Sequence, residues 1–264
     1  MSDVFNMEDQ VKQFFYDGFD VANFGRYTKG YTKALESFDM AIAIKPDDTR
    51  TGLYDGDTLG KPRRDWDAVN SYDKAIAIDL EFADAWVRRG VALSRLDRYT
   101  EAVNVFDKAI AINPDYADAW VSRGDALGYL GQYTDAIASY DKAITINLDY
   151  VDAWVSRGDA LVKFGRHAEG IASYDKAIAI NPNNAEAWHN RGVALHNLGQ
   201  YGEAVDSYDN AIAINPNNAE TWHNRGVALH HLGWYAEAVD SYGKAIAINP
   251  DHAMVQSDAK NRYL

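Results

Sequence analysis

Tryptophan recurs every 34 residues through most of the 264-residue chain, and this period constrains the fold more than any other feature of the sequence. A glycine follows each of these tryptophans four residues later, and alanine, an aromatic residue and usually proline recur at fixed offsets further along. A period of roughly 20 to 50 residues indicates stacked supersecondary units, because one unit of that size cannot bury its apolar face alone. The tryptophans are Trp86, Trp120, Trp154, Trp188 and Trp222.

Each unit holds two apolar stripes with three- and four-residue spacing, which is typical of amphipathic helices. In the first regular unit one stripe runs over residues 85–96 and the other over 99–110. Because only a few residues separate the two stripes, they predict an antiparallel pair of helices. We call these the first helix and the second helix of each repeat. The glycine after each tryptophan, such as Gly90, predicts a close approach of the two helix backbones. A second glycine predicts a left-handed end to the first helix at Gly131, Gly165, Gly199 and Gly233.

This pattern resembles the tetratricopeptide repeat (TPR) family, whose unit is a helix-turn-helix of about 34 residues. The resemblance covers nearly the whole chain. It implies an all-α fold, a right-handed α-solenoid of about seven TPR helix-turn-helix repeats plus a C-terminal solvating helix. In this family the first helices line a concave groove in which partners, usually extended peptides, bind. The residues that carry the resemblance in the first regular unit are Trp86, Gly90, Ala102, Phe106, Ala109 and Pro114.

The repeat pattern predicts a single TPR solenoid over residues 1–264. Five regular repeats fill residues 83–250, and a degenerate repeat without the tryptophan precedes them at 49–80. Residues 1–46 align as an atypical N-terminal repeat only with a four-residue insertion, as is common for a terminal repeat. Residues 251–264 begin another unit and predict a C-terminal capping helix that covers the last repeat.

The charge and composition narrow the class of partner. The chain carries a formal net charge of −13, which repels phosphate groups. We therefore expect no nucleic acid and no membrane as partner, and we expect a protein or peptide of basic character. The chain has no cysteine, no secretory signal and no apolar run of about 18 residues, and we predict a cytoplasmic protein.

Side chains beside the tryptophans of repeats six and seven are the first candidates for partner binding. Asn190 and Asn224 stand two residues after a tryptophan, and an amide there can bind a peptide backbone because it both donates and accepts hydrogen bonds. The alternative is that both are solvated polar groups. His189 and His223 precede them and belong to the same predicted site.

Three further residues complete the predicted partner-binding set. Asp125 and Asp159 each directly follow the glycine that stands four residues after the tryptophan of their repeat, and they would make the groove acidic. Trp234 stands in an inter-helix turn where the other repeats have a polar residue. An exposed aromatic residue there either contacts a partner or folds back onto the neighbouring turn.

Five of the seven histidines lie in repeats six and seven. His189 and His196 are two helical turns apart, about 10 Å, which is too far for one metal ion with ligands at about 2 Å. Two bridging sites or a pH-dependent partner site stay open, and so does simple duplication of one repeat. We predict no metal site.

An acid stands two residues before each tryptophan, where family members that clamp a C-terminal carboxylate have lysine, so the resemblance argues against such a clamp. Asn183 with Glu186, and Asn217 with Glu220, predict capping boxes at the start of first helices. An arginine precedes each of the five repeat glycines and needs a partner if it is buried. Aspartates of the second helices are the predicted partners, namely Asp107, Asp141, Asp175 and Asp209.

No phosphate-binding glycine loop, metalloprotease motif or nucleophile elbow occurs in the sequence. We therefore expect no catalytic residue and no cofactor, and we predict a non-enzymatic protein–protein interaction scaffold that binds a peptide or protein in its concave groove. It would act as a monomer or with weak self-association. Two alternatives stay open: self-assembly into dimers or filaments through the solenoid ends, and a regulatory or substrate-recruiting partner of a separate enzyme.

Overall fold

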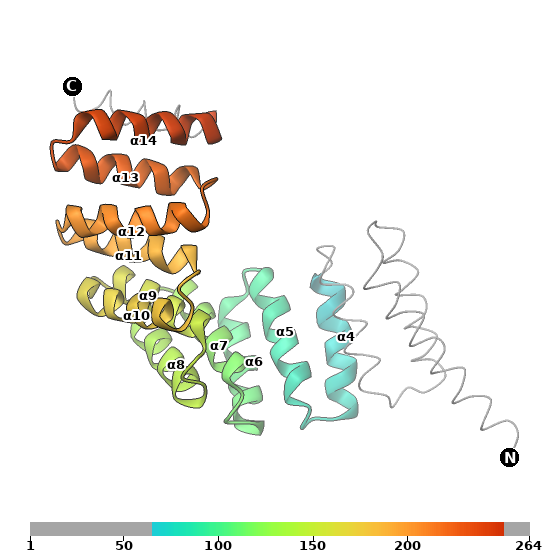
Figure 1. The fold of residues 1–264 in the computed structure, drawn as a ribbon. Coiled ribbons are helices and arrows are strands. Elements are labelled where there is room, and N and C mark those ends of the chain that lie inside the picture. Colours follow the sequence, from blue (N-terminus) through green and yellow to red (C-terminus); the bar gives the residue numbers. More distant parts are fainter. Residues whose placement is uncertain (1–64, 251–264) are drawn as a thin grey trace, which may run out of the picture. The chain divides into compact units, whose positions relative to one another are not determined.

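The computed structural model describes residues 65–250 of the chain. The chain divides into two compact units, Met1–Gln132 and Tyr133–Leu264, and each is described by itself (Figure 1). The predicted N-terminal repeat at 1–46 and the predicted capping helix at 251–264 lie outside the described residues.

Within residues 65–250 the chain forms eleven helices and no strand, which confirms the all-α prediction. First helices have 13 residues and complete second helices have 14, in the alternation that the two apolar stripes predict. The first unit contains α4 (Asp65–Ile78), α5 (Ala83–Arg95), α6 (Tyr99–Ile112) and α7 (Ala117–Tyr129). The second unit contains α8 (Tyr133–Ile146), α9 (Val151–Lys163), α10 (His167–Ile180), α11 (Ala185–Asn197), α12 (Tyr201–Ile214), α13 (Ala219–His231) and α14 (Tyr235–Ile248).

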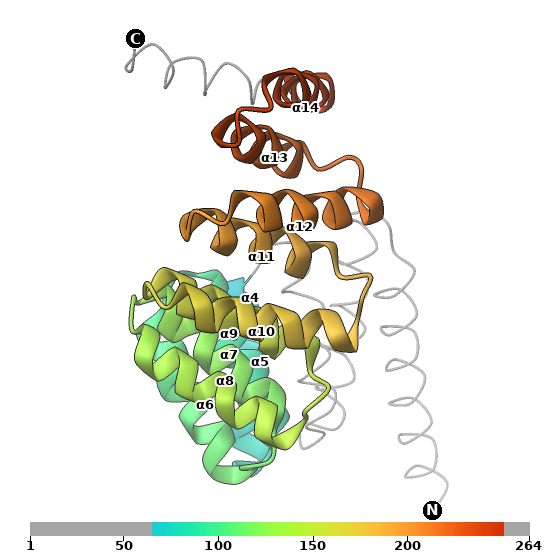
Figure 2. The same ribbon diagram turned by 60° about the vertical axis from the view of Figure 1, so that its left-hand side comes forward.

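Consecutive helices pack against one another within each unit, in chain order, which is the arrangement of an α-solenoid. Figure 2 shows this stacking from α9 to α14. First helices of adjacent repeats also touch: α5 contacts α7 in the first unit, and α11 contacts both α9 and α13 in the second. Each unit therefore presents a surface made of first helices, which we call its first-helix face.

The first helices end as the sequence predicts. Gly131, Gly165, Gly199 and Gly233 have φ angles of 73° to 85°, a left-handed conformation that glycine adopts without steric cost. The matching position of the α5–α6 turn holds Asp97, whose φ is 58°. Asp97 is the only residue other than glycine with a positive φ among residues 65–250.

The glycines that follow Trp86, Trp154, Trp188 and Trp222 each face an aromatic ring of the second helix, which the sequence analysis did not predict. The predicted close approach of helix backbones is present in the repeat of Gly158, whose carbonyl oxygen would lie 3.1 Å from a Cβ atom on Gly170. A Cβ atom built on Gly192 would lie 2.6 Å from Cε1 of Tyr208, and one on Gly158 would lie 2.5 Å from Cε1 of Tyr174. The aromatic ring of the second helix thus fills the space that a side chain on the first helix would need.

The recurring tryptophan ties each first helix to the preceding turn. Its indole Nε1 donates a hydrogen bond to the backbone carbonyl six residues earlier, at 2.9 to 3.0 Å in all five repeats. In three repeats that carbonyl belongs to proline; Leu148 supplies it to Trp154 equally well. The tryptophans are therefore structural residues.

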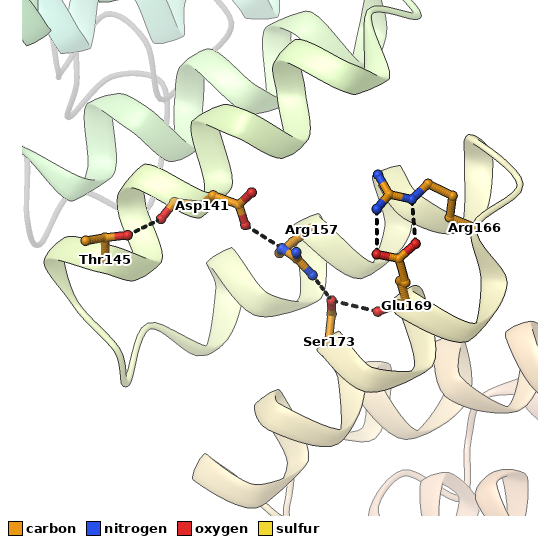
Figure 3. Close-up of polar contacts among 6 residues, drawn as sticks. All are labelled: Asp141, Thr145, Arg157, Arg166, Glu169 and Ser173. Carbon is orange, nitrogen blue, oxygen red and sulfur yellow. Dashed lines mark hydrogen bonds and ion pairs between the residues drawn. The ribbon is translucent and has the colours of Figure 1, made fainter.

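The predicted arginine–aspartate pairs form in every regular repeat. Each arginine donates through Nε to the aspartate sixteen residues earlier, on the second helix of the preceding repeat, at 2.5 to 2.7 Å. Figure 3 shows the pair of Arg157 with Asp141 and a further bond from Arg157 to Ser173. The arginine side chains are 21 to 24% exposed, so they are partly and not fully buried.

The predicted capping boxes do not form, because each N-cap lies one residue later than predicted and the third helical residue is then Ala187 or Thr221 and not a glutamate. The N-cap of α11 is Asn184, whose side chain accepts a hydrogen bond from Ala187 N at 2.9 Å, and the N-cap of α13 is Asn218. Asn183 instead belongs to the turn, where its N–H bonds to Oδ1 of Asn181. None of the helices in residues 65–250 has the length and apolar character needed to cross a lipid bilayer.

Candidate partner-binding face

The first-helix face of the second unit carries most of the predicted site. His189 and Asn190 lie on α11, and His223 and Asn224 take the equivalent places on α13. All four side chains are partly buried. Because α11 and α13 are in contact, the structure brings these two pairs onto neighbouring helices.

Asn190 and Asp159 form a polar network that the separate predictions for them did not anticipate. Nδ2 of Asn190 donates to Oδ1 of Asp159 at 3.0 Å, and the hydroxyl of Tyr174 donates to the same oxygen at 2.6 Å. Burial raises the pKa of the Asp159 carboxyl, although both hydrogen bonds oppose that rise. Burial also raises the pKa of Tyr174, so its hydroxyl stays a donor. Part of the hydrogen-bonding capacity of Asn190 is thus used within the unit.

Asn224 lacks such a partner. The position that corresponds to Asp159 one repeat before Asn224 is Val193, which cannot accept a hydrogen bond. Among the described residues the side chain of Asn224 forms no hydrogen bond, although it is half-buried. Its amide is therefore available on the first-helix face.

The histidines divide into two groups. Nδ1 of His189 shares a hydrogen bond of 2.8 Å with Oγ1 of Thr221, and its ring packs at 5.8 Å from that of Tyr208. Burial lowers the pKa of His189, against the opposing attraction of Glu220 and Glu186. Thr221 was missed by the sequence analysis; threonine in a position where other first helices have alanine was the available signal.

The second group forms a cluster of rings at the C-terminal ends of α11 and α13. His231 stacks on Tyr201 at 4.5 Å, and His196 packs edge-on against both rings. His230 meets His231 and Tyr235 in the same way. Burial, and secondarily the neighbouring His231, lower the pKa of His196. Within residues 65–250 no group of three or more histidine or acidic side chains has the arrangement of a metal site.

The first unit holds a cavity of about 340 Å³ lined by α5, α6, α7 and the turn between α5 and α6, which we call the α5–α7 cavity. Asp125, the predicted site residue of this unit, lines it. The other lining residues were not predicted, although Asp97 in a glycine position was a visible signal. They are Val91, Ser94, Arg95, Asp97, Tyr99, Phe106, Ser122 and Tyr129.

Trp234 lies in the turn before α14 and is 54% exposed. It is continuous with an exposed stripe along α14 formed by Tyr235, Val239 and Ile246. The equivalents of the last two residues in the preceding repeat, Val205 and Ile212, are buried against the repeat that follows them. The structure thus places Trp234 at the last described repeat, beside Tyr235, whose ring packs against His230.

Antiparallel helix pairs with a 34-residue period, stacked in order and presenting a face of first helices, define a repeat protein of the α-solenoid class. Family models described as TPR repeat or tetratricopeptide repeat match residues 83–116, 105–138, 124–165, 158–199, 194–233 and 219–252. Together the matches run from residue 83 to residue 252, more than half of the chain. The chain belongs to the tetratricopeptide repeat family.

Several solved structures are similar to this chain. The crystal structure of YrrB, described as a TPR protein with an unusual peptide-binding site, is 25% identical, with a TM-score of 0.59 over 73% of this chain and 99% of YrrB. A tetratricopeptide repeat protein from Parabacteroides merdae is 17% identical, with a TM-score of 0.70 over 94% and 97%. MamA is 22% identical, with a TM-score of 0.59 over 66% and 95%. No curated protein sequence matches the chain.

Proposed function

We propose that the protein is a non-enzymatic scaffold that binds an extended segment of a partner protein along its first-helix faces. The observation that carries this proposal is Asn224, a half-buried amide on that face with no hydrogen bond to the described residues. An amide can donate to one peptide group and accept from another, which suits it to an extended backbone. A peptide backbone would satisfy it.

Two further points support this function. The similarity to YrrB, whose structure is described with a peptide-binding site, makes peptide recognition a reasonable role for the same fold. The first turns of α9, α11 and α13 carry the exposed acids Asp152, Glu186 and Glu220, within a chain of net charge −13. Such a surface favours a basic partner segment, because complementary charge accelerates and orients association.

The test is affinity capture from lysate of the source cells followed by binding measurements with each captured protein. The bait variant Asn224→Ala removes the available amide and leaves the Asp159–Asn190 bond intact. Asn210→Ala is the matched control, because Asn210 is an exposed amide on the second helix α12 that bonds only to the Asp206 carbonyl. The proposal requires that a partner binds the wild type and the control but is weakened about fivefold or more by Asn224→Ala. Equal binding of all three baits would exclude this face.

The exposed stripe of α14 favours a second candidate function, self-association through the last described repeat. Val239 is 67% exposed, whereas its equivalent Val205 is 6% exposed because the next repeat covers it. A second copy could cover the stripe in the same way. Analytical sedimentation of the wild type and of Val239→Glu tests this function. A mass that rises with concentration only for the wild type supports self-association, and a wild type that is monomeric at every concentration excludes it.

A further inference from the structure

The α5–α7 cavity has an aromatic wall. The rings of Tyr99 and Tyr129 stack with centroids 4.7 Å apart and planes within 10°. Tyr129 is 72% exposed, so Tyr99 supports one face of its ring while the rest of the residue is open to solvent. The face of an aromatic ring carries partial negative charge and attracts cations that lie flat against it.

The polar side of the cavity is acidic. Asp97 and Asp125 contribute two carboxylates, and the one base in the lining, Arg95, lies 3.6 Å from Asp65, an acid outside the lining. The lining thus holds two carboxylates and one base, and its formal charge is negative. A positively charged group is the complementary occupant.

Asp97, one of the two lining carboxylates, has an unusual backbone conformation for a residue with a side chain. It has a left-handed backbone, φ 58°, at a turn where the other four first helices end in glycine. Its Oδ1 accepts a hydrogen bond of 2.7 Å from the Tyr99 hydroxyl. That bond raises the pKa of Tyr99 to about 12, so the ring that supports Tyr129 stays neutral. A carboxylate has further acceptor sites after it accepts one hydrogen bond, and these remain for a ligand.

We propose that the α5–α7 cavity binds the guanidinium group of an arginine side chain in the partner segment, stacked on Tyr129 and bonded to the carboxylates of Asp97 and Asp125. Arginine fits better than lysine, because its planar group stacks on a ring and donates several hydrogen bonds in one plane. The volume of about 340 Å³ is at the small end for ligand sites and suits one side chain. This inference rests on the proposed peptide-binding function and names one residue of the bound segment.

The test uses nuclear magnetic resonance on the full ¹⁵N-labelled chain. The probe is a blocked pentapeptide of glycine and serine with one central arginine. Its counterpart has citrulline there, which has nearly the same shape and no charge. We expect saturable shifts of the backbone amides of Ser94, Ser122 and Asp125 with the arginine peptide, and binding about tenfold weaker with citrulline.

Variants separate the cavity from a general attraction of basic peptides to an acidic protein. Tyr129→Ala and Asp97→Gly should each weaken arginine binding about fivefold or more. Asp97→Gly restores the residue that the other turns have, so loss of folding does not obscure its result. The control Asp118→Asn removes an exposed acid of α7 outside the cavity lining and should leave the cavity shifts intact.

Two results would overturn the inference: equal binding of the arginine and citrulline peptides, or shifts that are spread over the surface and are unaffected by Tyr129→Ala. Neither result bears on Asn224, which lies in the other unit and is tested with captured partners. If Asn224→Ala reduces partner binding but the arginine peptide does not bind the cavity, the peptide-binding proposal is supported and the arginine site is refuted. If the cavity binds arginine and the asparagine variant has no effect, the proposed path along α11 and α13 fails.

Discussion

Arg157 donates a hydrogen bond from Nε to Oδ1 of Asp141 at 2.6 Å, across the boundary between one repeat and the next. The same guanidinium donates from Nη1 to Oγ of Ser173 at 2.7 Å, on the second helix of its own repeat (Figure 3). One side chain therefore holds a first helix to both of the second helices that flank it.

The Arg157–Asp141 pair should contribute a measurable coupling energy. The two side chains are 21% and 52% exposed, so solvent screens the pair in part and we expect about 0.5–1 kcal/mol. A double-mutant cycle of Arg157→Met and Asp141→Asn, followed by urea unfolding, measures it. The same cycle on the more exposed pair of Arg166 and Glu169 should give a smaller value. Equal couplings in the two cycles would contradict this expectation.

Gly192→Ala should destabilise the second unit by about 1–3 kcal/mol, because its Cβ atom would overlap the ring of Tyr208, which is fully buried and cannot move aside. Gly202→Ala is the control. Gly202 lies on the same helix as Tyr208 with open space around it, so alanine there should be neutral or stabilise by up to about 1 kcal/mol. Thermal unfolding compares the two. A neutral Gly192→Ala would show that the ring adjusts.

Asp97→Gly should stabilise the first unit by up to about 1 kcal/mol, because a left-handed backbone is strained for any residue with a Cβ atom. Loss of the bond from Tyr99 offsets part of the gain. The reverse change, Gly165→Asp, should destabilise through backbone strain alone, since nothing lies within 4 Å of its Cβ position. Urea midpoints that shift in the same direction for both variants would refute the explanation.

Stability should fall as the pH drops below about 6.5, the ordinary pKa of histidine. Burial lowers the pKa of His196 in the folded protein, so the unfolded chain takes up the proton first and is favoured until the pH also passes below the folded pKa. His196→Leu should reduce the loss between pH 7.5 and pH 5.5 by at most about 1.4 kcal/mol, because pH 5.5 lies only about one unit below the ordinary pKa of histidine.

Urea midpoints at those two pH values check this, with Asn197→Leu as a non-titrating control on the same helix. His189, whose pKa burial also lowers, stays in both variants and accounts for a residual slope. A His196→Leu protein that loses as much stability as the control would assign the pH dependence to other groups.

Local chemistry explains which parts of the fold could be predicted from sequence. Glycines such as Gly165 and the partners of residues such as Arg157 recur with the period, and recurrence identifies both the left-handed turn and the pairing. The N-cap was predicted one residue early, at Asn183, because two asparagines stand in succession and only the backbone geometry selects Asn184. The role of Gly192 was predicted only in part, because the sequence does not show that a ring on the second helix occupies the space beside it.

The site was harder to predict because its contacts depart from the repeat. Asn190 bonds to Asp159 in the repeat before it, and this pair exists only where an asparagine follows a repeat that carries the acid. His196 meets Tyr201, which most repeats share, and His231, whose position holds asparagine one repeat earlier. Side chains that occur in only one or two repeats leave little periodic signal, so their neighbours follow only from coordinates.

The arginine bonds also bear on how such an array can lengthen. Arg157 finds its aspartate sixteen residues earlier and its serine sixteen residues later, and Arg191 and Arg225 do the same in their own repeats. Where a repeat carries this aspartate, arginine and serine, a duplicated stretch of one period therefore inserts a unit whose donors and acceptors already match both neighbours. Gene duplication alone can extend the array without a compensating substitution at the new junction.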